Sequence, residues 1–205
     1  MLVAGAGASA LTLEWAMSLL LTHPEAMRKL RAEIDSQVGD DQRLTNESDL
    51  PKLPYLKCVI NETLRLYPVL SLMLPHSSSR ACTVGGFEVP AGTVLMANLW
   101  AMHRDPKVWE DPDEFRPERI EAALNEPKCS KFAPIGIGRR SCPGAGMGVH
   151  IASLTAGVLV QCFEWEKIGL QEDMEYVIST SLRKKIPSQA LCTPRQHLLH
   201  LLSHV

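Results

Sequence analysis

The first 22 residues constrain the fold most, because they form an apolar stretch with a single charged side chain, Glu14. A transmembrane helix would place that carboxylate near its midpoint, at a cost of about 2–3 kcal/mol. A secretory signal peptide opens with Lys or Arg, whereas the first basic residue here is Arg28. A buried helix of an α-rich protein requires neither a carboxylate inside a membrane nor a signal peptide without a basic start. The segment is therefore predicted to be a core helix, and its uncapped start suggests that the chain begins in the middle of a fold.

The small residues of this segment allow a second interpretation. Residues 5–10 spell Gly-x-Gly-x-x-Ala, which matches the dinucleotide-binding fingerprint. That fingerprint follows a strand, but only four residues precede Gly5, and Pro24 opens another helix where a second strand is needed. We therefore favour a helix whose small residues let another group approach its backbone.

Composition excludes several classes of protein. Lys and Arg number 21 and Asp and Glu 23, so the net charge of −2 gives no basic footprint for nucleic acid. Hydrophobic residues at 45% and charged residues at 21% are typical of a globular chain and exclude a disordered one. No Cys-x-x-Cys pair occurs, and the wide spacing favours reduced thiols over disulfides. The six cysteines are Cys58, Cys82, Cys129, Cys142, Cys162 and Cys192.

Periodicity predicts a single, mostly helical α+β domain over residues 1–205, without a linker or repeat. Apolar stripes predict helices at 24–38 and 55–67, separated by a polar loop at 39–54, and a further apolar helix at 144–163. Gly-Gly and Pro-Ala-Gly turns predict short strands at 83–84, 87–89 and 93–95, and Pro-rich turns fill 105–117. Short strands and loops are expected in the last forty or so residues, with a solvated turn at Lys184 and Lys185.

The most distinctive pattern is a glycine-rich loop with one cysteine, residues 135–144, just ahead of the predicted apolar helix. The helix dipole and the two arginines before Cys142 both favour thiolate over thiol. Glycines let the backbone approach a flat or bulky ligand. A thiolate held in this way suits a metal ligand or a nucleophile. A structural turn with an inert cysteine stays open, whereas a phosphate loop lacks its Gly-Lys-Ser/Thr ending.

Two charged clusters precede that loop. Glu62 and Arg65 are helical neighbours, so they form either a solvated pair of little consequence or a buried bidentate pair. Residues 115–119, Phe-Arg-Pro-Glu-Arg, form a second cluster in a Pro-rich turn. Each is unremarkable alone, but their order ahead of Cys142 is specific.

In this order the patterns resemble the C-terminal half of a cytochrome P450, a haem-thiolate monooxygenase. The resemblance covers essentially the whole chain, from Ala4-Gly5 through Glu-x-x-Arg and Pro-Glu-Arg to the cysteine loop. The wording Pro-x-Gly-x-Gly-Arg-Arg-x-Cys-Pro-Gly is similar to that of plant microsomal members, and within them to isoflavone and flavonoid hydroxylases. The expected fold is a truncated half of that family's fold, mainly α with small β-sheets.

The resemblance implies a role for each matching residue. Cys142 is the expected axial ligand of the haem iron. Arg140 and His76 are the expected partners of the haem propionates, and Glu62, Arg65 and Arg119 form a structural charge network on the cysteine-loop side. The remaining cofactor-binding positions are small residues that let the haem, oxygen or substrate approach: Gly136, Gly138, Gly144, Ala4 and Gly5.

The chain departs from the family pattern at several positions. Gly7 and Ala8 replace the acid and Thr that deliver protons in the family, so no catalytic residue is assigned. Ser9 supplies a hydroxyl one residue later, about 100° around the helix. Ile135 stands where the family prefers Phe. The membrane anchor, much of the substrate pocket and another propionate-binding helix would precede Met1.

The resemblance implies an enzyme that hydroxylates a small hydrophobic, flavonoid-type substrate, using oxygen and electrons from an NADPH-dependent cytochrome P450 reductase. Arg139 and Lys131 would suit an acidic reductase surface. The alternatives are a truncated non-catalytic paralogue that binds haem weakly or not at all, and a domain using Cys142 as a plain thiol. The family location is the cytosolic face of the endoplasmic reticulum membrane, whereas the isolated fragment, without an anchor, is expected to be cytosolic and inactive.

The remaining histidines are weak candidates for metal ligands. His197, His200 and His204 lie in an apolar–polar tail, and a zinc site would need a fourth ligand and a rigid scaffold. His103 and His150 are expected to be packed or surface residues.

Overall fold

The structure is a computed structural model that describes residues 2–39, 43–125, 132–169, 174–178 and 181–202. Its α-helices are α1 (Leu2–Thr22), α2 (Pro24–Val38), α3 (Pro54–Leu66), α4 (Leu99–Met102), α5 (Glu118–Asn125), α6 (Ala145–Cys162) and α7 (Leu199–Leu202). Three 3₁₀ helices are η1 (Glu47–Lys52), η2 (Gly138–Arg140) and η3 (Gln196–Leu198). The strands are β1 (His76–Ser77), β2 (Cys82–Val84), β3 (Phe87–Val89), β4 (Val94–Leu95), β5 (Phe163–Lys167), β6 (Tyr176–Ile178), β7 (Leu182–Lys184) and β8 (Ala190–Pro194).

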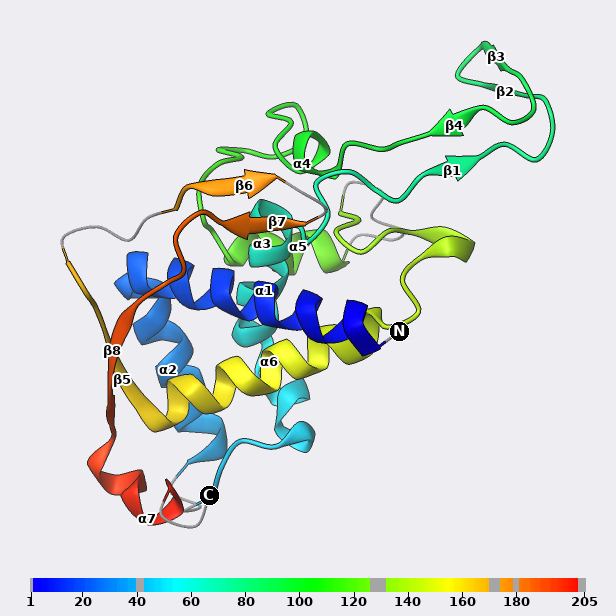
Figure 1. Cartoon of the computed structure of the whole chain (residues 1–205). Helices are drawn as coiled ribbons and strands as arrows, with labels where there is room; N and C mark the ends of the chain where they lie inside the picture. Colours follow the sequence, from blue (N-terminus) through cyan, green and yellow to red (C-terminus); the bar gives the residue numbers. More distant parts are fainter. Residues whose placement is uncertain (1, 40–42, 126–131, 170–173, 179–180, 203–205) are drawn as a thin grey trace.

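The core is helical, and α1, α2, α3 and α6 supply most of it. Figure 1 shows α1 in blue and α6 in yellow running side by side, and α3 also packs against both. The described strands form four two-stranded antiparallel sheets, pairing β1 with β4, β2 with β3, β5 with β8 and β6 with β7. The expected mainly α architecture with small sheets is therefore confirmed.

The prediction that the first 22 residues form a core helix is confirmed only for the second half of α1, because residues 5–7 and Ala10 are exposed. Trp15, Ala16 and Leu20 are almost fully buried. Glu14 is accommodated because its Oε1 accepts the backbone N–H of Ser188 at 3.2 Å. Residues 5–10 lie inside this helix with no described strand before them, which removes the dinucleotide-fingerprint interpretation.

The apolar stripes of α2 and α3 face the core. Met27, Leu30 and Ile34 of α2 are buried, as are Leu56 and Ile60 of α3. Among the described helices, α6 alone is long and apolar enough to cross a membrane by length and composition. Because α6 packs against α1, α2 and α3, we interpret it as a core helix.

The predicted polar loop 39–54 contains η1, which the sequence interpretation missed. Asn46 accepts Ser48 N–H at 2.9 Å, and Asp49 accepts Asn46 N–H at 3.0 Å, so the two residues form a capping box. Asp49 also receives two bonds from Arg43, at 2.6 and 2.9 Å. The Arg43 guanidinium is the main reason that the pKa of Asp49 falls to about 2.

The prediction that Lys184 lies in a solvated turn is wrong. Lys184 is buried in β7, where its Nζ donates to Ser18 Oγ of α1 at 3.1 Å. The ammonium also lies 5.5 Å from the ring centroid of Trp15. Its burial depends on a contact between residues 166 positions apart, which a local pattern does not reveal.

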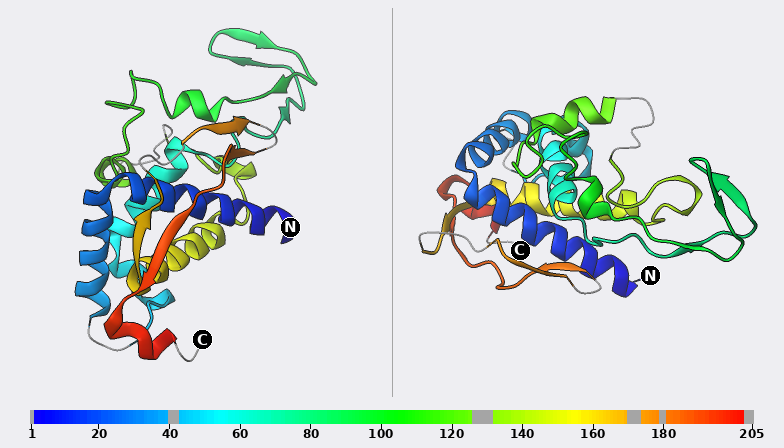
Figure 2. Two further views of the ribbon diagram at one scale, coloured as in Figure 1. Left: turned by 60° about the vertical axis from the view of Figure 1, so that its left-hand side comes forward. Right: turned by 90° about the horizontal axis from the view of Figure 1, so that it is seen from above.

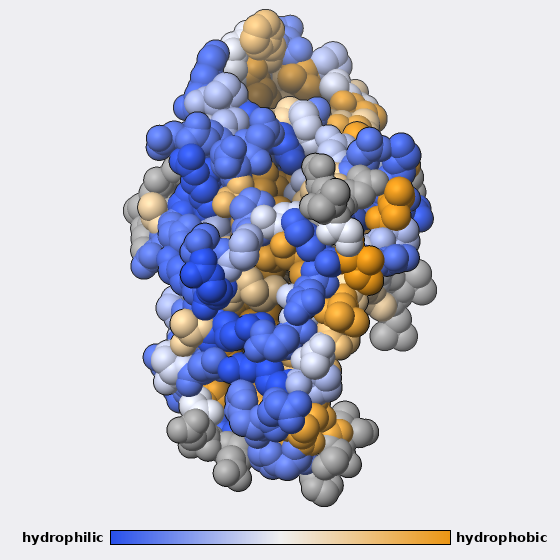
Figure 3. All heavy atoms as spheres, turned by 90° about the vertical axis from the view of Figure 1, so that its left-hand side faces the viewer, coloured by the Kyte–Doolittle hydropathy of each residue, from blue (hydrophilic) through white to orange (hydrophobic). Residues whose placement is uncertain are grey.

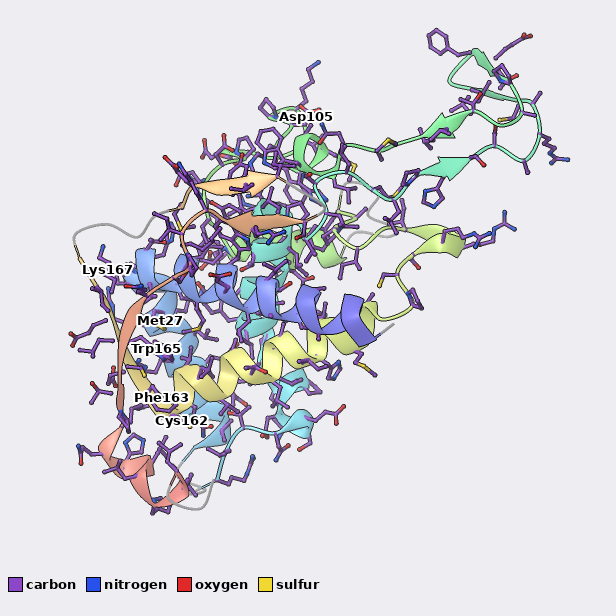
Figure 4. All side chains as sticks on the ribbon, in the orientation of Figure 1. Met27, Asp105, Cys162, Phe163, Trp165 and Lys167 are labelled. Carbon is purple, nitrogen blue, oxygen red and sulfur yellow. The ribbon has the colours of Figure 1, made fainter. Side chains whose placement is uncertain are left out.

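The face at the left of Figure 1 is mainly hydrophilic, as Figure 3 shows. Arg195 forms two bonds to Asp35, at 2.8 and 2.9 Å, and thereby ties the end of β8 to α2. Figure 4 shows residues 162–167 running from the end of α6 directly into β5.

Candidate haem-binding site

The cysteine loop is a set of tight turns closed by backbone hydrogen bonds. Cys142 N–H donates to Ile135 O at 3.1 Å, which brings the two ends of the loop together. Gly136 and Gly138 have φ values of 78° and 77°, a left-handed conformation that glycine adopts without steric cost. Cys142 itself is solvent-exposed and stands three residues before α6 begins. The loop therefore presents one thiol at a helix N-terminus.

Gly144 lies against that thiol. A Cβ built on Gly144 would lie 3.9 Å from Cys142 Sγ, within van der Waals contact. A side chain here would therefore cover one side of the sulfur. The expected need for glycine therefore has a local geometric basis at positions 136 and 138, where φ is positive, and not at 144, and it does not identify a ligand.

The start of α1 lies beside the start of α6. Ser9 Oγ is 3.9 Å from the position that a Gly148 Cβ would occupy. Figures 1 and 2 show that the beginning of α1, the loop ahead of α6 and the β1–β4 pair emerge from the same end of the helical core. The first turns of α1, which include Ala4 and Gly5, therefore lie at the same end as the cysteine loop.

The two expected propionate partners also lie at this end. His76 is half-buried in β1, with Nδ1 2.7 Å from Leu74 O. Arg140 is exposed at the end of η2. Among the described residues, neither side chain forms a hydrogen bond or ion pair with Cys142. They are available to a ligand, but the structure does not bring them into contact with each other.

Glu62 and Arg65 form a buried bidentate pair. Both side chains have 0% exposure, and the two bonds measure 2.7 and 2.9 Å. Arg65 also donates to the carbonyls of His103, Pro112 and Glu114, at 2.6, 2.7 and 3.2 Å. Of the two alternatives left by the sequence, the buried pair is the one observed.

Arg119 completes this charge network. Its Nε lies 3.1 Å from Glu62 Oε1, and its Nη atoms donate to the carbonyls of Glu110, Asp111 and Glu114. Burial lowers the pKa of Arg119, while Glu62 opposes that change. The network therefore fastens α3 to the turns that lead into α5.

The donor set fits a chelated iron better than a free metal ion. Among the described residues no group of three or more His, Cys, Asp or Glu side chains could hold a metal. His197 and His200 are exposed in the tail, and His204 lies outside the described residues. One accessible thiol on a loop without other protein donors suits an axial position on an iron whose remaining ligands come from a macrocycle.

Comparison with known proteins decides the family. The family model for cytochrome P450 matches residues 1–192. The chain belongs to the cytochrome P450 family. Cytochrome P450 81D1 of Arabidopsis thaliana is 47% identical over 204 residues, covering 99% of this chain and 40% of that protein. The isoflavone 2'-hydroxylase of Glycyrrhiza echinata is 48% identical over 196 residues, covering 95% of this chain and 38% of the relative.

Solved structures agree with this assignment. A zebrafish cytochrome P450 determined with progesterone superposes with a TM-score of 0.84 at 34% identity, covering 94% of this chain and 43% of the other. The chain thus spans about two-fifths of the length of its cytochrome P450 relatives. Its fold is a partial cytochrome P450 fold, as the sequence predicted.

The positions that depart from the P450 pattern are visible in the structure. Gly7 is exposed and Ala8 half-buried on α1, and neither side chain carries a proton donor. Ser9 Oγ donates to Gly5 O at 3.1 Å, so its hydroxyl hydrogen is engaged by the helix itself. Ile135 is half-buried and packs against the core cluster.

Sequence reasoning did not identify the connection that His103 makes. Of the two alternatives expected for His103, a packed or a surface residue, the structure shows the packed one, because its exposure is 0%. However, its ring accepts a hydrogen bond from Ala133, thirty positions later, which no local pattern signals. Of the other residues singled out, Cys129 and Lys131 lie outside the described residues, and the remaining five cysteines are free thiols.

Proposed function

We propose that these residues form the thiolate-bearing part of a haem-dependent monooxygenase that hydroxylates a small aromatic compound of the flavonoid class. The observation that carries this proposal is the exposed Cys142 thiol on its glycine loop ahead of α6, in a chain of the P450 family. The names of relatives such as the isoflavone 2'-hydroxylase support the substrate class.

In this proposal Cys142 binds the iron as thiolate, and the glycines at 136, 138 and 144 keep the space around its sulfur open. Arg140 and His76 bind the propionates, and the small residues Ala4 and Gly5 are assigned to the side where oxygen and substrate bind. When bound, haem supplies the iron that activates dioxygen, so that one oxygen atom enters a C–H bond and the other leaves as water. The rest of the substrate pocket is proposed to lie in the part of the fold that the relatives have and these residues do not cover.

The proton supply on α1 is weak in this proposal. Glycine and alanine at positions 7 and 8 hold no proton, and Ser9 already donates to Gly5 O. Protons must then arrive through water, so electrons from the reductase are consumed with a poor yield of product. This feature motivates the alternative of a non-catalytic paralogue, which the experiment below tests.

The proposed electron donor is an NADPH-dependent cytochrome P450 reductase. The exposed Arg139 beside Cys142 offers a positive charge to an acidic partner surface. By analogy with the family, the proposed location of the whole enzyme is the cytosolic face of the endoplasmic reticulum membrane. The 205 residues alone are proposed to be inactive even when haem is bound, because they span about two-fifths of the length of the relatives and enclose the substrate only in part.

The test begins with haem binding to the chain. Haem-loaded wild type and Cys142→Ser are reduced, exposed to carbon monoxide and examined for the thiolate-type Soret band. Cys192→Ser, which alters another exposed cysteine, is the matched control. The band is expected in wild type and in the control and absent in Cys142→Ser. A band that survives in Cys142→Ser overturns the ligand assignment, and its absence from every variant favours the non-catalytic alternative.

Activity is tested separately. The chain is assayed alone and joined to the preceding portion of the isoflavone 2'-hydroxylase, with reductase, NADPH and isoflavones, and products are identified by mass spectrometry. Hydroxylated product from the joined protein alone is expected. Product from the 205 residues alone that disappears with Cys142→Ala contradicts the proposed inactivity of the fragment.

A further inference from the structure

His103 connects the buried charge network to the chain that enters the cysteine loop. It follows α4 and is fully buried. Its backbone carbonyl accepts Arg65 Nη1 at 2.6 Å, while its ring Nε2 accepts Ala133 N–H at 3.2 Å. The ring also lies against Phe132, with centroids 5.9 Å apart. One residue is thus fastened to α3 through its backbone and to the cysteine-loop segment through its side chain.

Two backbone hydrogen bonds connect Ala133 to Cys142 through the turn at Gly136. Ala133 O accepts Gly136 N–H at 3.1 Å, and Ile135 O accepts Cys142 N–H at 3.1 Å. Ala133 is 4% exposed, so it lies away from solvent. A displacement of Ala133 would therefore shift both the Gly136 turn and the backbone of Cys142.

The contact requires a neutral ring with one defined tautomer. Because Nε2 accepts from Ala133, the ring proton must reside on Nδ1. Burial, followed by the charges of Arg65 and Arg104, lowers the pKa of His103 to about 4, so the ring is neutral near neutral pH. Nδ1 is buried without a hydrogen-bond partner among the described residues. An unpaired buried donor destabilises the folded state, so Nδ1 does not stabilise this position. The stabilising contribution of the imidazole is therefore the hydrogen bond that Nε2 accepts from Ala133 N–H.

We propose that His103 is a positioning residue, whose Nε2 holds Ala133 and thereby fixes the loop that presents Cys142. The Glu62–Arg65 network holds the backbone of His103 in place. The His103 ring in turn holds Ala133, at the start of the segment that leads into the cysteine loop. The consequence for haem ligation rests on the function proposed above, whereas the consequence for loop rigidity does not.

The test compares two amide variants of His103. A glutamine amide oxygen reaches about the place of Nε2 and can accept from Ala133, whereas the shorter asparagine places its oxygen near Nδ1. His150→Gln, on the exposed side of α6, is the matched control. Hydrogen exchange is measured in the full chain at the amides of Ala133, Gly136 and Cys142, with amides of α2 as the reference for global unfolding.

His103→Asn is expected to speed exchange at these loop amides by about three- to tenfold relative to α2. His103→Gln and His150→Gln are expected to keep the wild-type values. Equal exchange in the Gln and Asn variants, whether fast or slow, overturns the role of Nε2. This readout needs no haem, so it stands even if Cys142→Ser shows that Cys142 does not bind the iron.

A second readout addresses ligation. In the haem-loaded, reduced carbon monoxide complexes, His103→Asn is expected to lose part of the thiolate-type Soret band, which His103→Gln retains. An undiminished band in His103→Asn, despite faster loop exchange, would limit the role of His103 to loop rigidity and refute its effect on the sulfur.

Discussion

Replacing Arg65 by alanine removes the guanidinium at the centre of the buried network. Arg65 makes two bonds to Glu62 and three to backbone carbonyls, and both charged side chains are fully buried. The variant leaves the Glu62 carboxylate with Arg119 Nε and the Arg116 N–H, each 3.1 Å away. Breaking one side of such a buried pair costs about 3–5 kcal/mol. This loss is a large share of the ~5–15 kcal/mol that stabilises a typical folded protein.

The chain contains a matched control for this prediction. Glu25 and Arg28 on α2 have the same i,i+3 spacing, but their side chains are 84% and 68% exposed. Arg28→Ala is therefore expected to cost no more than about 0.5 kcal/mol. Arg65→Lys keeps the charge without the two-pronged geometry and should fall between the two variants.

The measurement is urea unfolding of the full chain, followed by far-ultraviolet circular dichroism. We expect a much lower midpoint for Arg65→Ala, an intermediate one for Arg65→Lys and little change for Arg28→Ala. An Arg65→Ala loss within about 1 kcal/mol of the Arg28→Ala loss would refute the argument that burial makes this pair consequential.

Three other perturbations give distinct expectations. Lowering the pH from above 6.5 to about 4 should destabilise wild type by about 3 kcal/mol more than His103→Gln, because the His103 ring binds a proton more readily in the unfolded state than in the folded state. Urea unfolding that depends on pH equally in the two proteins would contradict this. Gly136→Ala should cost about 1–2 kcal/mol because its φ is 78°, whereas Gly146→Ala in open space on α6 should gain about 0.5–1 kcal/mol, and thermal unfolding that reverses this order would exclude the explanation. In the joined protein, Gly7→Asp with Ala8→Thr should raise the product formed per NADPH, since acid–base help is worth about 10²–10⁴-fold; an unchanged ratio would show that water or Ser9 already delivers the proton.

Local signals predicted the elements that depend on nearby residues. The stripes of α2 and α3 appear in the structure within about one residue of the predicted ends, and Gly-Gly and Pro-Ala-Gly turns marked β2, β3 and β4 correctly. The cysteine loop was also readable, because its glycines and the helix after it are adjacent in the sequence. The η1 capping box had a readable signal as well, Asn46 followed three residues later by Asp49, which was passed over.

Contacts across the chain were not predictable in this way. Lys184 was predicted to be a surface residue. Its partners Ser18 and Trp15 lie in α1, more than 160 residues earlier, so the residues near Lys184 in the sequence do not indicate its burial. The sequence alone does not distinguish an exposed from a buried Glu62–Arg65 pair. The burial depends on the distant turns whose carbonyls, those of Pro112 and Glu114, accept hydrogen bonds from Arg65. Local motifs indicated the candidate site residues, whose roles in binding haem stay predictions, whereas the contacts that support these residues depend on tertiary structure.

The position of Cys142 also depends on how closely α6 approaches its neighbours. A Cβ at Gly157 would lie 3.3 Å from Leu56 of α3, and one at Gly148 would touch Ser9 of α1 at 3.9 Å. The absence of a side chain at Gly157 lets α3 lie directly against α6, whereas the Gly148 position has ordinary van der Waals space beside α1. Because the cysteine loop runs directly into α6, any shift of this helix would move the thiol relative to α1. The packing of α6 and the His103 contact therefore restrain the loop from opposite sides, the first after Cys142 and the second before it.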